Sequence, residues 1–287
     1  MQSAGEAAKE IVSRELGLLQ VDLQPLSGGC ISSAFKVSVP GAEYFIKVNA
    51  ENKGLFAAES EGLRLLKDTH TVNVPEVIAS GIWGDYGFLI LELIHSGRPA
   101  SQFWDKFAEG LASLHKNTSD YYGLSSDNYI GALPQINSPG NNWIEFFITH
   151  RLEYQLKMAM DAGKIPKSVC DDFQLLYKKL PDLLVLEPPA LIHGDLWSGN
   201  FIVNSKGEAA LIDPAVYYAH REIEIAFTTL FGGFDSRFYS VYQEVFPFQP
   251  GFEDRIDIYN LYPLLVHVNL FGGSYLGSVK SILKRLV

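Results

Sequence analysis

The chain has 287 residues, of which 47% are hydrophobic and 13% aromatic, and its formal net charge is −10 at pH 7. This length suits one large domain or two modest ones, and the many aromatic residues argue against disorder. The acidic balance argues against nucleic acid as a partner, because phosphate contacts require a basic surface.

The sequence contains no uninterrupted apolar run of about 18 residues, so we expect no membrane span and no membrane partner. The first residues show neither the basic flank nor the apolar stretch of a signal peptide. Two cysteines, Cys30 and Cys170, are too few for a disulfide framework. We therefore expect the protein to be located in the reducing cytoplasm. A location inside an organelle is the alternative if a transit peptide has been removed.

Residues 4–19 carry apolar side chains at helical spacing, which predicts an amphipathic helix. A glycine-containing loop follows between two β-like runs. Backbone N–H groups in such a loop can cradle a phosphate. The loop therefore predicts nucleotide contacts from Gly28, Gly29, Cys30, Ile31 and Ser32. The alternative is a plain hairpin turn between strands.

Residues 43–48 predict an apolar strand that contains Lys47. A buried lysine is costly unless it is paired. The helix predicted at 55–66 offers Glu59 at the edge of its apolar face, with Glu61 as the competing partner. A strand lysine paired with a helix glutamate binds the nucleotide phosphates in protein kinases, so we place Lys47 and Glu59 in the nucleotide site. The alternative is a lysine that reaches solvent at a sheet edge.

The sequence predicts two more strands, at 74–78 and 87–94, followed by a break at 96–99 that contains Gly and Pro. We expect the break to separate an N-terminal lobe, 1–95, from a helical C-terminal lobe, 96–287. The segment that joins two such lobes is expected to contact adenine, which makes Glu92 and Leu93 candidates for nucleotide binding.

Helical periodicity dominates the rest of the chain. It predicts helices at 103–115, 143–160 and 171–180, a helix that opens within 217–226, and a mostly helical end at 255–287. The segment 121–139 has no strong period and is expected to form an ordered loop.

The stretch 191–200 places Asp195 and Asn200 in a tight, glycine-containing loop. A hairpin predicted over 201–212 would return Asp213 to the neighbourhood of Asn200. These groups suit phosphoryl transfer from ATP: Asp195 accepts the proton of the attacking hydroxyl, while Asn200 and Asp213 bind Mg²⁺. The alternative is two polar loops that cap strands. Three further residues are candidates for substrate contact: Trp197, His220 and Glu222. For His220 and Glu222, a role in capping a hairpin is an equally open alternative.

Together these motifs resemble the fructosamine kinase (ketosamine 3-kinase) family, from about Leu26 to the C-terminus. The resemblance rests on Gly-Gly-Cys-Ile-Ser, Phe-Ile-Lys, Phe-Ala-Ala-Glu, His-Gly-Asp-Leu-Trp-Ser-Gly-Asn, Ile-Asp-Pro-Ala, His-Arg-Glu and Leu-Phe-Gly-Gly-Phe. It implies an α+β, protein-kinase-like fold with a small antiparallel-sheet lobe and a larger helical lobe. The implied reaction transfers the γ-phosphate of ATP to the 3-hydroxyl of a ketosamine on a protein or a free amine. The product is unstable and releases the amine, so the implied activity is deglycation.

By position, the resemblance implies the same roles that are proposed above. Lys47 and Glu59 would bind the phosphates, Asp195 would be the base, and Asn200 and Asp213 would bind Mg²⁺. One departure is Glu224, which keeps the charge of the family's usual Asp but has a longer side chain. The resemblance also implies a disulfide between the Cys30 residues of two chains, and hence a redox-linked homodimer. A monomer in which Cys30 is a small buried filler is the alternative.

Two other functions remain open. A kinase of aminoglycosides or choline would share Asp195, Asn200 and Asp213. Its cation could bind in an aromatic box, although the same aromatic residues could equally be core: Trp143, Tyr217 and Tyr218. A non-catalytic kinase-like binding module is disfavoured, because the sequence retains all the residues that the chemistry requires.

Overall fold

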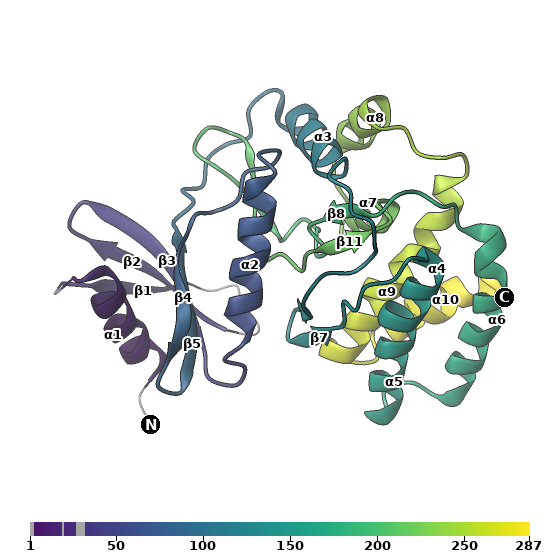
Figure 1. Ribbon diagram of the computed structural model, residues 1–287, viewed down its shortest axis with the longest axis horizontal. Helices are drawn as coiled ribbons and strands as arrows, with labels where there is room; N and C mark the ends of the chain where they lie inside the picture. Colours follow the sequence, from purple (N-terminus) through teal and green to yellow (C-terminus); the bar gives the residue numbers. More distant parts are fainter. Residues whose placement is uncertain (1–2, 19, 27–31) are drawn as a thin grey trace. The chain divides into compact units, whose positions relative to one another are not determined.

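The computed structural model describes residues 3–18, 20–26 and 32–287. The chain forms two compact units (Figure 1). The first consists of Met1–Phe103 and Phe201–Pro214, and the second of Trp104–Asn200 and Ala215–Val287. The first unit thus extends beyond the boundary expected at residue 95 and includes a later segment of the chain.

A five-stranded antiparallel sheet forms the centre of the first unit. Its strands have the spatial order β1-β2-β3-β5-β4. They span, in chain order, Asp22–Leu26, Ser33–Val39, Ala42–Asn49, Val77–Trp83 and Tyr86–Glu92. The strand expected at 74–78 therefore begins later, at Val77. Strand β3 occupies the middle of the sheet, which places Lys47 among buried neighbours.

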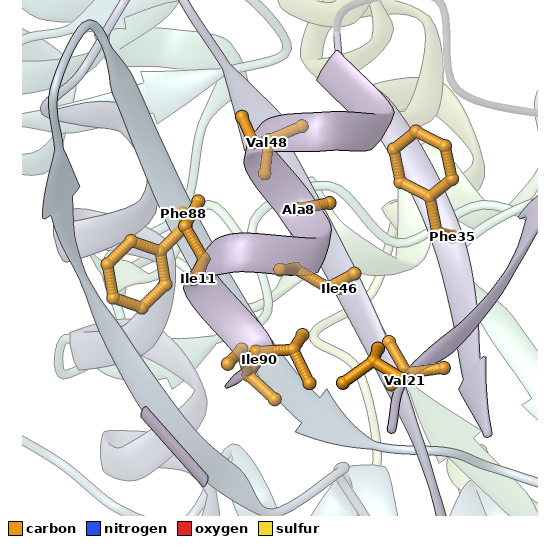
Figure 2. Packing of buried hydrophobic residues seen from close by; sticks show 11 residues of the cluster. Ala8, Ile11, Val21, Phe35, Ile46, Val48, Phe88 and Ile90 are labelled. Carbon is orange, nitrogen blue, oxygen red and sulfur yellow. The ribbon is translucent and has the colours of Figure 1, made fainter. Parts of the chain in front are cut away.

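Helix α1 (Ala4–Leu16) packs on one face of this sheet (Figure 2). It begins with a capping box between Ser3 and Glu6, and it ends before Gly17, whose φ of 67° lies in the left-handed region. Its buried residues Ile11 and Val12 contact an apolar cluster that includes Val37, Ile46, Val48 and Ile90. The predicted helix is therefore present but shorter than 4–19.

Helix α2 (Leu55–Asp68) belongs to the opposite face of the sheet and buries Phe56, Leu63 and Leu66. Side chains alternate between the two faces of a strand. Because Ile46 and Val48 face α1, Lys47 between them faces α2. The same alternation that builds the α1 core thus directs the lysine toward Glu59.

A hairpin of β9 (Phe201–Val203) and β10 (Ala209–Leu211) completes the first unit. Its backbone is tied to this unit at three places: Gly97 N donates to Val203 O, Ala100 N to Gly207 O, and Leu211 N to Asn73 O. These hydrogen bonds are the physical reason why 201–214 associates with the N-terminal part of the chain.

The second unit is mainly helical. Its helices are α3 (Phe103–Leu114), α4 (Trp143–Phe146), a π-helix η1 (Phe147–Glu153), α5 (Tyr154–Asp161), α6 (Lys167–Leu183), α7 (Glu222–Thr228), α8 (Ser236–Val245), α9 (Phe252–Phe271) and α10 (Leu276–Leu286). A small hairpin joins β6 (Asn128–Ile130) to β7 (Leu133–Gln135), and β8 (Ala190–Ile192) pairs antiparallel with β11 (Tyr217–Ala219), which follows later in the chain. The helix expected to open within 217–226 therefore starts only at Glu222, after a strand. The expected α+β class, with a sheet first and helices later, is confirmed.

Candidate functional site

Lys47 forms two ion pairs within the first unit. Its Nζ lies 2.8 Å from Oε1 of Glu59 and 2.5 Å from Oδ1 of Asp213. The side chains of Lys47 and Glu59 are each only 11% exposed, whereas that of Asp213 is 46% exposed. The lysine therefore pairs with Glu59 and not with the exposed Glu61, and it also binds the acid that follows the β9–β10 hairpin.

Burial and charge act in opposite directions on this triad. Burial alone would lower the pKa of Lys47, but Glu59 and Asp213 outweigh it and raise the pKa above its ordinary value. Burial raises the pKa of Glu59, although the lysine opposes that rise. The ammonium is thus held charged where it could bind a phosphate, with Asp213 as its more exposed partner.

Asp213 adopts an uncommon backbone conformation for a residue with a side chain. Its φ is 56°, in the left-handed region, and Pro214 follows directly. A residue before proline normally prefers extended backbone. Aspartate tolerates the left-handed region better than most residues, at a cost of roughly 1–2 kcal/mol. Such strain is often found at functional sites, and here it occurs where the carboxylate meets Lys47.

Asp195 and Asn200 are brought together in the second unit. The Asn200 amide donates from Nδ2 to Asp195 O at 2.7 Å and to Asp195 Oδ2 at 2.9 Å. The Asn200 backbone N–H also donates to Trp197 O at 3.0 Å, which closes the loop. The five-residue spacing seen in the sequence therefore produces a direct contact between the predicted base and a predicted metal ligand.

Gly194 allows the close backbone approach on which this loop depends. Its φ is 86°, and a Cβ atom at this position would lie 2.0 Å from Ala215 O. The preceding strand β8 pairs with β11, and Ala215 N donates to His193 O at 2.9 Å. Only glycine fits between these backbones without displacing one of them.

Glu224, whose role the sequence leaves open, anchors the same loop through a hydrogen bond from Gly194 N. Its Oε1 accepts from Gly194 N at 2.7 Å, and its Oε2 lies 2.8 Å from His115 Nε2. The other ring nitrogen of His115 lies 2.6 Å from the hydroxyl of Tyr242. Burial alone would raise the pKa of Glu224, but His115 and the Gly194 N–H hold it below its ordinary value.

A sequence signal for Glu224 did exist. It lies in α7 among buried apolar residues, including Ile223 and Ile225. An acid in such a run must have partners, because an unpaired buried charge is very costly. The sequence does not reveal that these partners are His115 and the backbone of Gly194, which are distant in the chain.

The three substrate candidates occupy different environments. Trp197 is partly exposed and makes an edge contact with Phe231, with ring centroids 5.8 Å apart. His220 is fully buried, and burial lowers its pKa to about 4. Glu222 is also fully buried and forms a bidentate salt bridge with Arg255, whose Nε and Nη2 donate to the carboxylate at 2.7 and 2.6 Å.

Most of the predicted phosphate loop, namely Gly28, Gly29, Cys30 and Ile31, lies outside the described residues. Ser32 is described, and its hydroxyl accepts from Asn49 Nδ2 at 3.4 Å. The two adenine candidates lie at the end of β5: Glu92 is exposed, and Leu93 directly follows the strand. Glu92 N donates to Glu76 O at 2.9 Å.

Asn200 and Asp213 each have an oxygen atom that could bind Mg²⁺, a cation that prefers hard oxygen ligands and few of them from the protein. Asn200 directs its NH₂ group to Asp195, so its carbonyl oxygen is the atom left for a cation. Asp213 contacts Lys47 through Oδ1 and retains Oδ2. Within the described ranges, no group of three or more His, Cys, Asp or Glu residues forms a metal cage.

Known proteins resemble this chain along almost its entire length. The fructosamine kinase family model matches residues 6–287. A probable ketoamine kinase of Synechocystis is 40% identical over 265 residues, which cover 91% of this chain and 88% of the relative. The chloroplastic protein-ribulosamine 3-kinase of Oryza sativa subsp. japonica is 39% identical over 267 residues, which cover 90% and 76% of the two chains.

A solved structure shows the same fold. It is that of a candidate fructosamine-3-kinase from Haemophilus somnus, with a TM-score of 0.88 and 27% identity over 99% of this chain and 97% of the other. The kinase-like fold expected from the motifs is thereby confirmed. No helix in the described part of the chain is both long and apolar enough to cross a membrane. From the match along its whole length, this chain belongs to the fructosamine kinase family.

Proposed function

We propose that this protein is an ATP-dependent kinase that phosphorylates the 3-hydroxyl of ketosamines. The observation that carries the proposal is the catalytic loop, in which Asp195 is held by Asn200 and, through Gly194, by a buried acid. Family membership supplies the reaction class, and the names of the ketoamine and ribulosamine kinases supply the substrate class.

The first unit contributes phosphate binding. Lys47 is held charged and immobile by Glu59 and Asp213, so little side-chain entropy is lost when it binds a phosphate oxygen. We assign the loop at 28–32 to the phosphates and Glu92 with Leu93 to adenine. These assignments remain predictions.

The second unit contributes the proton acceptor. Asp195 would accept the proton of the sugar 3-hydroxyl as its oxygen bonds to the γ-phosphorus, and ADP would leave with the electrons of the broken P–O bond. The hydrogen bond from Asn200 fixes the rotamer of this carboxylate. We assign a structural role within the second unit to the buried His220 and Glu222, and contact with the substrate to Trp197.

Asn200 and Asp213 would hold Mg²⁺, which neutralises phosphate charge when bound. Phosphorylation at the 3-position makes the ketosamine unstable and frees the amine, so the proposed role is deglycation of proteins or small amines. The redox-linked dimer through Cys30 and the cytoplasmic location remain predictions. Activity with and without reductant, in wild type and Cys30→Ala, tests the dimer.

The test measures ADP release with ribulosyl-lysine and fructosyl-lysine, with kanamycin and choline as control acceptors. We expect turnover of a ketosamine only. Asp195→Asn should lower kcat by about 10²–10⁴-fold because the proton acceptor is lost. ATP affinity should remain close to that of wild type. Turnover of a control acceptor alone, or an active Asp195→Asn variant, would contradict the proposal.

A further inference from the structure

Three buried amide side chains connect the hairpin of β6 and β7 to the backbone beside the catalytic loop. They belong to Asn128, Gln135 and Asn137, are here termed the amide clamp, and are each at most 6% exposed. All three lie within 121–139, a segment to which the function proposed above gives no role. Buried amides are costly unless their polar groups are paired, so their partners indicate what they hold in place.

The amide clamp donates to two consecutive backbone carbonyls just before strand β11. Gln135 Nε2 donates to Ala215 O at 3.0 Å. Asn128 Nδ2 donates to Val216 O at 2.7 Å. The clamp residues also bond to one another, since Gln135 Nε2 and Asn137 Nδ2 both donate to Asn128 Oδ1 at 2.8 Å. Ala215 and Val216 are only 2% and 1% exposed, so their carbonyls depend on protein donors.

Ala215 links the amide clamp to the catalytic loop. Its backbone N–H donates to His193 O at 2.9 Å, and its carbonyl oxygen would lie 2.0 Å from a Cβ atom on Gly194. The next residue in the chain is Asp195. A displacement of Ala215 would therefore move the backbone that carries the predicted base. Misplacement of a catalytic group by about 1 Å can lower a rate by about 10²-fold.

Arg151 supports the amide clamp from the π-helix η1. It is fully buried, and its guanidinium donates to three neutral oxygens: Nη1 to Ile136 O at 2.7 Å and His150 O at 3.2 Å, and Nη2 to Asn137 Oδ1 at 2.7 Å. The guanidinium carbon also lies 3.8 Å from the ring centroid of Tyr217. A buried cation requires such partners, and π-helices are rare elements that often occur at functional sites. The position of Asn137 is therefore fixed by a buried charge.

We propose that the amide clamp, supported by Arg151, positions the catalytic loop for phosphoryl transfer. This inference rests on the function proposed above. Gln135 and Asn128 are positioning residues, because they act through the backbone of Ala215 and not on the reacting atoms. Side-chain amides suit this role, since each can donate to a carbonyl and also accept from a neighbour. The resulting network is connected, and connected polar networks restrain geometry more than separate hydrogen bonds do.

The experiment compares Gln135→Met and Asn128→Leu with wild type and with a matched control, Gln155→Met. Each replacement keeps the approximate size of the side chain and removes its amide. Gln155 is also a buried glutamine of the second unit, and its Oε1 accepts from Asn269 Nδ2 at 2.7 Å. This partner belongs to helix α9 and not to the catalytic loop. The control thus loses a comparable hydrogen bond at a different place in the same unit.

We expect kcat for ribulosyl-lysine to fall about tenfold in Gln135→Met and in Asn128→Leu, while the KM for ATP and for the acceptor changes less than about twofold. Hydrogen–deuterium exchange of the backbone amides at 193–196 and 215–217 should be about fivefold faster in both variants. The double variant should lose little more activity than either single variant, because the two residues act as one unit. Gln155→Met should have a lower Tm but the kcat and the local exchange of wild type.

The two readouts separate this inference from the function on which it depends. A wild-type enzyme that phosphorylates no ketosamine would overturn the proposed function, and hydrogen exchange would then decide whether the amide clamp restrains the loop. Wild-type kcat and wild-type exchange in the clamp variants would overturn the positioning role alone. An equal fall of kcat in Gln155→Met would also overturn it, because any loss of a buried amide would then have the same effect. If circular dichroism shows that one clamp variant is unfolded, the other decides.

Discussion

Replacement of Glu224 gives the sharpest test of how the catalytic loop is held. The fully buried carboxylate makes two hydrogen bonds, from Gly194 N at 2.7 Å and with His115 Nε2 at 2.8 Å. Glu224→Ala removes both, so that Gly194 N and His115 Nε2 lose the partner that this carboxylate provides. A hydrogen bond to a charged group is worth about 1.5–3 kcal/mol, so the expected loss of stability is roughly 3–5 kcal/mol.

Glu224→Gln is the informative partner variant because it keeps the shape of the side chain. The amide oxygen can still accept from Gly194 N, and the amide NH₂ group can donate to His115 Nε2. We expect a stability loss of only about 1 kcal/mol. The kcat should fall by about tenfold, because a neutral acceptor holds the loop of Asp195 less firmly.

The assays are thermal unfolding, followed by circular dichroism, and steady-state kinetics with both substrates varied. For Glu224→Ala a decrease in Tm of about 5–8 °C is expected. The KM for ATP should change little in Glu224→Gln, because Lys47 and Glu59 belong to the other unit. A Glu224→Ala variant with wild-type Tm and kcat would refute the anchoring role.

Three further results are expected. Gly194→Ala should destabilise the protein by more than about 2 kcal/mol and reduce kcat, because the new Cβ would meet Ala215 O; urea unfolding and kinetics measure both effects. Lys47→Met should lower kcat by about a hundredfold or more in the same kinetic assay, because the charge that binds phosphate is lost. Buried His220 has a folded pKa of about 4 against 6.5 for the free group, so the unfolded chain binds the additional proton between these values. Stability should therefore fall by up to about 3 kcal/mol as the pH drops from 6.5 to 4, and urea unfolding of His220→Phe should show a smaller fall.

The sequence was sufficient where the physical cause is local. The alternation along β3 and the helical spacing of α2 predicted that Lys47 would face Glu59, and the two side chains form an ion pair. The glycines around Asp195 predicted a tight loop, and Asn200 closes it. In each case a few neighbouring residues determine the geometry.

The sequence does not predict those parts of the fold that depend on hydrogen bonds between backbone groups far apart in the chain. Helix α7 begins within the expected range 217–226, but the first residues of that segment form strand β11, because Tyr217–Ala219 pairs with β8. The first unit includes 201–214, because the hairpin bonds to Asn73 and Gly97. Neither pairing leaves a pattern in the segment itself.

Glu224 shows how the two kinds of information combine. The sequence shows only that its side chain is longer than that of the family's usual Asp, whereas the structure shows both carboxylate oxygens bonded to buried groups. Glu224→Asp would withdraw the carboxylate by about 1.5 Å, the length of one C–C bond. It could then reach Gly194 N or His115, but not both at 2.7–2.8 Å. We therefore expect stability between those of the Gln and Ala variants, whereas a wild-type Tm would show that the unit can relax around the shorter acid.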